Sequence, residues 1–252
     1  PVRKFLQILS KILLNRLLRK MNFYPDIIIT SNIYWVQYIK YFKSIYDINV
    51  IYDCNDNPIA FPNVINSEHY FIETLNISTK IVIPFQSYSN FIPDKYRNKI
   101  NIISNGVDVQ SMTKPSIKVA ELEKLNSKII MYIGSIDTRL DFDLITFLVT
   151  ELTKYDFVFV GDIKRQISDK FLKIKMQDNF YHFHSINYNQ INNYLSYAMV
   201  CIIPFKSNPL SNFILPNKIF EYSILGKPFL MTNFNVDLKN LCNKLKIIDN
   251  KE

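Results

Sequence analysis

The sequence predicts an α/β fold made of two parallel-sheet halves. Short runs rich in Ile, Val and Phe alternate with segments of helical pattern along the 252 residues. Most of these runs are continuously apolar, which is typical of strands that are covered on both faces. Strand–helix alternation implies βαβ units, parallel sheets and right-handed crossovers. The alternation breaks once, so we expect one Rossmann-like half on each side of the break.

The elements follow in order from these patterns. The β-branched and aromatic runs predict strands at 26–30, 49–53, 80–84, 101–104, 128–134, 157–161, 179–184, 200–204, 228–232 and 246–249. The mixed polar and apolar segments between them predict helices at 1–20, 33–46, 66–78, 141–154, 188–197 and 216–225. The segment in which the alternation breaks has a polar composition. We therefore expect domains at 1–108 and 128–252, a linker at 109–127, and a cleft between the two halves.

The start of the chain is strongly basic, within a net charge of +8. Residues 1–20 contain six Lys and Arg residues and no acidic residue. Their apolar positions recur at helical spacing, which indicates a basic amphipathic helix: Phe5, Leu9, Ile12, Leu13 and Leu17. Such a helix could dock on an anionic membrane surface. The slightly favoured alternative is a helix that packs on a sheet and keeps a solvated basic edge.

Other features of the composition limit the class of protein. No run of about 18 apolar residues is present, so the sequence predicts no membrane span. Cys54, Cys201 and Cys242 are far apart, which favours buried free thiols in a reducing cytoplasm over a disulfide framework or a zinc site. Because the chain begins with Pro1 and a predicted strand lies almost at its end, we expect both ends to continue in a longer protein.

Four glycines are few for a chain of this length. Gly106, Gly134, Gly161 and Gly226 lie mostly where an apolar run ends or a new one begins. Glycine is favoured where the backbone adopts φ > 0 or approaches another group closely. We therefore expect turns and a ligand-facing loop, above all at Gly134. Ordinary tight turns explain Gly106 and Gly226 equally well.

Residues 204–228 are the richest stretch in chemically useful groups. A polar loop follows a predicted strand, and a helix follows that begins near a proline and ends at a glycine. Asn217 and Lys218 would lie at the helix N-terminus, where free N–H groups favour a phosphate. Glu221 would lie on nearly the same face one turn later, where it could bind ribose hydroxyls. The alternative is a surface ion pair between Lys218 and Glu221, which would stabilise little.

The same stretch resembles a known family. Pro-x-Lys-x-x-Glu-Tyr at 216–222, followed by Gly-Lys-Pro at 226–228, is similar to the donor-site signature of GT-B glycosyltransferases, especially the retaining family 4 and group 1 enzymes. Further similar segments occur in the family's order at 50–56, 104–108, 132–141, 159–162 and 200–205. The resemblance covers most of the chain from residue 25 onward. The family's first acceptor-domain units and its C-terminal helices have no counterpart in this sequence.

The resemblance implies a nucleoside-diphosphate sugar as donor, bound by the C-terminal half. Glu221 would bind the ribose of the donor. The backbone of Gly134 and Ser135 would approach the diphosphate, and Arg139 and Lys218 would neutralise it. Cations and a helix terminus can stabilise a departing diphosphate without a metal, so no cofactor is expected beyond the donor itself.

The resemblance also implies roles outside the phosphate site. Asn217 would complete the donor site, and the turn at His184 would flank the nucleobase through backbone groups. The N-terminal half would bind the acceptor, with Asp56 near its hydroxyl. One position departs from the family: eight residues before Glu221, where many members have a second Glu, this sequence has Phe213. Either backbone groups of the loop 208–212 contact the sugar in place of that Glu, or this protein is a catalytically weakened member of the family.

Rival motifs are weaker. Asp141 and Asp143 form an Asp-x-Asp pattern that is typical of metal-dependent enzymes, but they lie at a predicted helix start, where acidic residues act as caps. Residues 53–57 begin like a calcium loop, but Pro58 occupies the position that requires glycine. Aromatic residues lie mainly within strand and helix patterns, so core packing explains them better than nucleic-acid binding does.

The sequence therefore predicts a glycosyltransferase that transfers a sugar, with retention and without a metal, to a surface-polysaccharide or glycolipid acceptor. The few cysteines favour a cytoplasmic protein. The basic start is compatible with a peripheral place at the inner face of the membrane, where the protein would meet a glycan or lipid-linked acceptor. The first alternative is a weakened copy that binds a nucleotide sugar or a partner without turnover. The second is a nucleotide-sugar epimerase of the same fold.

Overall fold

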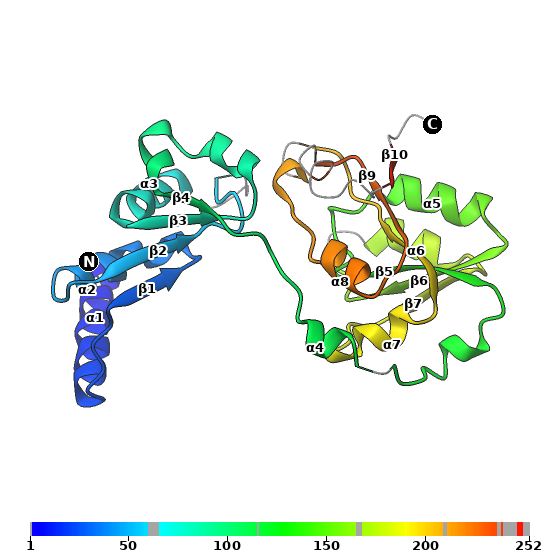
Figure 1. The fold of residues 1–252 in the computed structure, drawn as a ribbon, viewed down its shortest axis with the longest axis horizontal. Coiled ribbons are helices and arrows are strands. Elements are labelled where there is room, and N and C mark those ends of the chain that lie inside the picture. The colour runs from blue at the N-terminus through cyan, green and yellow to red at the C-terminus, as the bar shows by residue number, and fades with distance from the viewer. Residues whose placement is uncertain are drawn as a thin grey trace. The chain divides into compact units, whose positions relative to one another are not determined.

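The computed structural model describes residues 2–59, 66–114, 116–164, 168–208, 211–235, 238 and 246–248. The chain forms two compact units, Pro1–Ser104 and Asn105–Glu252 (Figure 1). Each unit contains a parallel sheet of its own. The predicted α/β class with two Rossmann-like parallel-sheet units is confirmed.

The first unit is built on a four-stranded sheet in the order β1-β2-β3-β4. Its strands are β1 (Ile27–Thr30), β2 (Asn49–Asp53), β3 (Lys80–Ile83) and β4 (Ile100–Ile102). Its helices are α1 (Val2–Lys20), α2 (Val36–Lys43) and α3 (Ser67–Ile77), with 3-10 turns at Ile33–Trp35, Gln86–Phe91 and Asp94–Lys99. Tyr52, Phe71 and Ile81 lie in its core with almost no exposed surface.

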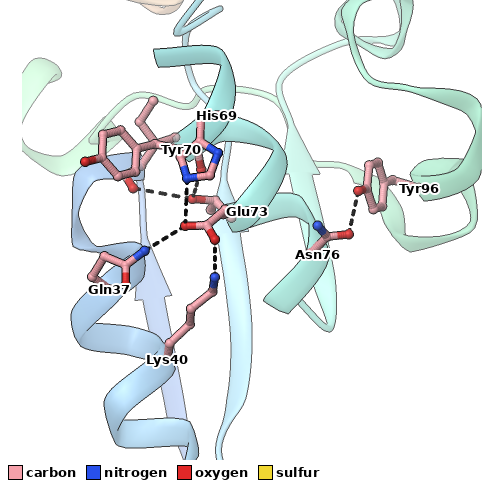
Figure 2. A network of polar contacts seen from close by, with 9 residues as sticks. Gln37, Lys40, His69, Tyr70, Glu73, Asn76 and Tyr96 are labelled. Carbon is pink, nitrogen blue, oxygen red and sulfur yellow. Dashed lines mark hydrogen bonds and ion pairs between the residues drawn. The ribbon is translucent and has the colours of Figure 1, made fainter. Parts of the chain in front are cut away.

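A polar network joins α2 to α3 (Figure 2). The Glu73 carboxylate on α3 accepts hydrogen bonds from Gln37 Nε2 at 2.7 Å and from the Lys40 ammonium, both on α2. His69 lies one turn before Glu73, with its Nε2 3.6 Å from the same carboxylate. These contacts fix the two helices to each other at the rim of the apolar core.

Helix α1 packs on the first unit, as the favoured interpretation of the sequence predicted, but with a different face. Leu14 and Leu18 contact the buried cluster formed by Ile39, Phe42, Ile48 and Val50. The predicted apolar face is exposed instead: Leu9, Ile12, Leu13 and Leu17 have 38–53% of their surface accessible. The side chain of Phe5 lies outside the described residues.

The second unit is built on a six-stranded sheet in the order β10-β9-β8-β5-β6-β7. Its strands are β5 (Lys128–Ile133), β6 (Tyr155–Val160), β7 (Phe180–Phe183), β8 (Ala198–Ile203), β9 (Phe229–Thr232) and β10 (Lys246–Ile248). Its helices are α4 (Val109–Met112), α5 (Phe142–Glu151), α6 (Ser168–Lys175), α7 (Ile191–Leu195) and α8 (Lys218–Ile224), with 3-10 turns at Leu122–Lys124, Tyr188–Gln190 and Ser211–Phe213.

The chain divides between Ser104 and Asn105, a few residues before the predicted boundary. The segment 109–127, predicted as a linker, belongs to the second unit and packs on it. Met112 is fully buried, and the Val119 N–H donates to the Tyr197 hydroxyl at 3.0 Å. A polar composition suggested a free connection, but these polar groups are used to fasten the segment to the surface of the second unit.

Candidate functional site

A cavity of about 360 Å³ lies at the carboxyl ends of β5 and β6 in the second unit. Ile133 and Val160 end these strands and are paired in register, and both line the cavity. The strand order runs from β5 through β6 to β7 on one side, and from β8 through β9 to β10 on the other. The cavity therefore lies at the switch point of the sheet, where open α/β folds bind their ligands.

Two glycines shape the floor of this cavity. Gly134 and Gly161 follow β5 and β6 with φ of +144° and +152°, a region that side chains rarely adopt. A Cβ on Gly161 would overlap the carbonyl oxygen of Gly134, and a Cβ on Gly134 would overlap the end of the Lys218 side chain. Glycine at both positions therefore lets the two loops and the ammonium group approach closely.

Lys218 and Glu221, on the first turn of α8, both line the cavity. Lys218 Nζ lies 5.1 Å from the ring centre of Tyr132 and 5.9 Å from that of Phe205. Glu221 has only 8% of its surface exposed. Within the described part of the chain, neither charged group has a hydrogen bond or an ion pair with another side chain. The surface ion pair considered as an alternative is therefore not formed.

Burial changes the proton affinity of both groups. It lowers the pKa of Lys218 to about 8. The nearby Arg139 also lowers this pKa, whereas Glu221 raises it. Burial raises the pKa of Glu221, and the nearby Lys218 opposes that rise. A pKa of about 8 leaves Lys218 mostly charged at neutral pH, and no side chain of the described residues forms an ion pair with it. An anionic group and a hydroxyl-rich group of a ligand are the complementary partners.

Arg139 lines the same cavity and is held in place by Asp137, a residue that the sequence interpretation missed. Asp137 Oδ1 accepts from Arg139 Nε at 2.9 Å, and Oδ2 accepts from Arg139 Nη2 at 2.6 Å. Although burial acts to raise the pKa of Asp137, the hydrogen bonds from Arg139 hold it below its usual value. The guanidinium also lies over the Phe205 ring at 5.6 Å. Arg139 is thus oriented, but part of its charge is already balanced.

Ser135 and Asn217 also line the cavity. The carbonyl of Ser135 accepts from the Tyr132 hydroxyl at 2.9 Å, which fixes the glycine loop. The side-chain oxygen of Asn217 accepts from Asn105 Nδ2 at 3.0 Å. The predicted phosphate cradle at the helix start is weaker than expected, because α8 has only seven residues and the N–H of Phe220 is already bonded to the Asn217 carbonyl.

His184 is the one predicted donor-site residue that does not line the cavity. Its side chain is 92% exposed, and its Nδ1 lies 3.9 Å from Asp162 Oδ1. The neighbouring Ser185 does line the cavity, and its hydroxyl donates to Asp162 Oδ2 at 2.7 Å. Asp162 and Lys164 are further lining residues. Of these two residues, only Asp162 could have been predicted from the sequence, because it follows the glycine at the end of a predicted strand.

Asp56 belongs to the first unit, so it is not part of this cavity. It lines a separate cavity of about 380 Å³ beside Asn32, Tyr34 and Tyr52, at the carboxyl ends of β1 and β2. The turn that carries it is held by a hydrogen bond from the Tyr88 hydroxyl to the Asn55 carbonyl at 2.9 Å. The exposed Asp56 carboxylate is thus placed on a fixed loop at the ligand-binding edge of a parallel sheet.

The Asp-x-Asp motif acts as a helix cap, as predicted. Asp141 precedes α5, and its Oδ1 accepts from the Leu144 N–H at 3.1 Å. In the part of the chain that the structure describes, no group of three His, Cys, Asp or Glu side chains could hold a metal. The predicted buried thiols are confirmed for Cys54 and Cys201, while Cys242 lies outside the described residues.

Phe213, at the position where many members of the similar family have Glu, ends the 3-10 turn Ser211–Phe213. In the preceding loop, the Asn208 N–H donates to Ser211 Oγ at 2.9 Å and Asn208 Oδ1 accepts from the Ser211 N–H at 3.0 Å. Residues 209 and 210 lie outside the described residues. The predicted backbone contact of this loop with a sugar therefore stays a prediction.

A comparison of sequences finds a partial match to one curated protein. No protein-family model matches it. TuaH of Bacillus subtilis, whose name assigns it as a glycosyltransferase of teichuronic acid biosynthesis, is 24% identical over 139 residues. That match covers 54% of this chain and 35% of TuaH. The chain therefore matches only about a third of the length of this curated relative.

Solved structures show the fold. Sucrose-phosphate synthase of Thermosynechococcus elongatus matches 96% of this chain with a TM-score of 0.72 and 12% identity. A glycosyltransferase of Rickettsia africae matches 96% with a TM-score of 0.70 and 17% identity, and Anabaena HepE, solved with UDP and glucose, matches 90% with a TM-score of 0.67 and 12% identity. The chain spans about two thirds of each, 65–66% of their lengths. It therefore has the fold of GT-B glycosyltransferases, with two Rossmann-like parallel-sheet units.

Proposed function

We propose that this protein is a GT-B glycosyltransferase of the retaining family 4 type, which transfers a sugar from a nucleoside diphosphate to a surface-polysaccharide or glycolipid acceptor. One observation carries the proposal. Lys218 and Glu221 face one cavity at the switch point of the second sheet, and neither has a hydrogen bond or an ion pair with another side chain in the described residues. The name of TuaH and the UDP and glucose bound to HepE support this choice of substrates.

The donor would bind with its diphosphate at Lys218 and its ribose at Glu221. The backbone of Gly134 and Ser135 would approach the phosphates, and the guanidinium of Arg139, oriented by Asp137, would lie beside them. As the bond between the sugar and the phosphate breaks, negative charge develops on the diphosphate. An ammonium group already placed in the cavity stabilises this charge without reorganisation. The carbohydrate carbon then forms its new bond to the acceptor oxygen, and the proton of that hydroxyl passes to an oxygen of the departing diphosphate.

The acceptor is proposed to bind in the first unit, near Asp56. A fixed carboxylate beside Tyr34 and Asn32 offers a hydrogen-bond acceptor and an aromatic face to a carbohydrate hydroxyl and ring. A lipid-linked acceptor would place the protein at the inner, cytoplasmic face of a membrane. None of the helices in the described ranges has the length and apolarity needed to cross a bilayer. Metal independence is proposed because Asp141 is engaged as a cap.

A second candidate is a copy that binds the nucleotide sugar without turnover. Phe213 favours it, because many members of the similar family have a carboxylate at this position. A nucleotide-sugar epimerase of the same fold is a third candidate. Its products distinguish it from the other two, since it would convert the donor with no acceptor present.

Product analysis with labelled donors tests the proposal. Candidate nucleoside-diphosphate sugars are first ranked by thermal shift, since a ligand of the native state raises the apparent melting temperature. The transferase predicts labelled product only when an acceptor extract is present. Tight nucleotide binding with no product would select the second candidate, and a converted donor without acceptor would select the epimerase.

Mutation of Glu221 tests the site itself. Glu221→Ala should weaken UDP binding about 10- to 100-fold, the effect of losing charge-assisted hydrogen bonds. Ser223→Ala is the matched control, because Ser223 is exposed on the same helix and does not line the cavity. A dissociation constant unaltered in Glu221→Ala would remove this carboxylate from the donor site.

A further inference from the structure

Helix α1 has a second apolar face, which points away from the unit on which it packs. Leu14 and Leu18 face the core cluster of the first unit. Leu9, Leu13 and Leu17 are 40%, 53% and 53% exposed. These three residues are spaced by four, so their side chains form one stripe along the helix. Met21, 66% exposed, extends the stripe by one more step, because its N–H donates to the Leu17 carbonyl at 3.0 Å and continues the last turn.

Basic side chains flank this stripe. Arg16 lies three residues after Leu13, and Lys20 three residues after Leu17, so each is a direct neighbour of the stripe on the helix surface. Both are exposed. No acidic residue occurs anywhere in residues 1–20. The exposed face of α1 therefore combines a narrow row of large apolar groups with positive charge that nothing on the same helix balances.

This combination restricts what can cover the stripe. An apolar protein surface would bury Arg16 and Lys20 without a partner, which is strongly unfavourable. A bilayer surface with anionic headgroups offers both an apolar layer for the stripe and negative charge for the basic side chains. The apolar side chains of an interfacial helix enter the headgroup and acyl boundary, while long basic side chains extend back to the headgroups and interact with their negative charge.

We propose that the stripe Leu9, Leu13, Leu17 and Met21, flanked by Arg16 and Lys20, docks the protein on the surface of a membrane that contains anionic lipids. The surface lies wholly within the first unit. It does not involve the residues of the donor cavity, so its use is independent of whether the chain transfers a sugar.

Flotation with lipid vesicles tests the proposal on the full chain. Wild-type protein should float with vesicles of phosphatidylcholine and phosphatidylglycerol, and should bind phosphatidylcholine vesicles far more weakly. The double variant Arg16→Gln, Lys20→Gln should bind the anionic vesicles about 25-fold more weakly, because each basic residue near an anionic surface contributes roughly a fivefold factor. Leu13→Ser, Leu17→Ser should also lose binding, since it removes the apolar stripe.

A matched control separates this surface from net charge. Lys124→Gln, Lys128→Gln makes the same change of charge at exposed positions of the second unit and should bind as wild type does. All substituted positions are exposed, so unchanged far-UV circular dichroism melting is expected and confirms folding. Absence of wild-type binding, or equal loss in the control pair, would overturn the proposal. So would a wild-type dimer that Leu13→Ser, Leu17→Ser converts to a monomer without a change in vesicle binding, since the stripe would then join two copies of the chain.

Discussion

At the residue scale, the charge in the proposed donor cavity depends on the protonation of Lys218. Its pKa is about 8 in the folded protein, against an ordinary value of 10.5. Between these two values the unfolded chain holds more protons than the folded one, so the contribution of this group to stability increases as the pH rises through that window. At neutral pH the cavity keeps its ammonium group, at a cost that a bound diphosphate would offset.

This property predicts a pH dependence of nucleotide binding. UDP affinity should be nearly constant between about pH 7 and pH 8 and fall by up to tenfold per pH unit above that, because the free protein loses the Lys218 proton. A phosphate's second pKa is about 6, so the diphosphate of the ligand does not titrate in this range. Isothermal titration calorimetry should detect proton uptake on binding. Lys218→Met should bind weakly with a flat profile, and a flat profile in the wild type would contradict the assignment.

The glycine at the end of β6 leads to a second prediction. Gly161→Ala places a Cβ against the Gly134 carbonyl at a φ of +152°, so the two loops must separate. We expect a loss of about 2 kcal/mol or more in unfolding free energy and a loss of UDP binding. Gly106→Ala is the control, because a Cβ there meets no atom within 4 Å. Equal stability of the two variants in urea unfolding would show that the loops are not closely apposed.

The sequence predicted many of the residues that line the proposed donor cavity. Gly134, Ser135, Arg139, Lys218 and Glu221 come from two separate segments, yet all line the cavity, since carboxyl ends of parallel strands meet at one edge of a sheet. Asp137 and Lys164 were not predicted. Their positions depend on how two loops fold over the strand ends, and periodicity carries no information about such loops. The exposure of His184 likewise depends on a turn beyond the strand.

At the element scale, strands were more predictable than helices. All ten predicted strands are present within about two residues of the expected ends. Short apolar runs rich in β-branched residues are typical of buried strands and are too short for most helices. Helix α6 was not predicted, since its buried contacts come from little more than Phe171 and Ile174. The predicted face of α1 was wrong for a related reason. The helix has apolar residues on two faces, and spacing alone does not show which face meets the core.

The cap of α5 gives a prediction at this scale that also tests the role of metals. Asp141→Ala should lower the unfolding free energy by about 1 kcal/mol, because the Leu144 N–H loses its acceptor. Asp141→Asn should be nearly as stable as the wild type, since Asn caps helices equally well. Transfer activity should be unchanged in Asp141→Asn and in the presence of a chelator. Loss of activity in the Asn variant at full stability would instead support metal binding by this motif.

At the scale of the whole molecule, the two units have separate sheets and separate cores. Such units usually unfold as separate cooperative blocks. The proposed donor site lies entirely in the unit Asn105–Glu252, and the proposed membrane surface lies entirely in Pro1–Ser104. A ligand of one unit should therefore stabilise that unit alone, which gives a way to assign each function to its part of the chain.

The sole tryptophan makes this prediction measurable. Trp35 lies in the first unit, so its fluorescence reports the unfolding of that unit, whereas far-UV circular dichroism reports both. UDP at about 100 times its dissociation constant should stabilise the second unit by about 2.7 kcal/mol and leave the Trp35 transition unmoved. Glu221→Ala should abolish the shift seen by circular dichroism. If the Trp35 transition moved together with the circular dichroism signal, the two units would unfold as one, and donor binding would be linked energetically to the part of the protein proposed to hold the acceptor.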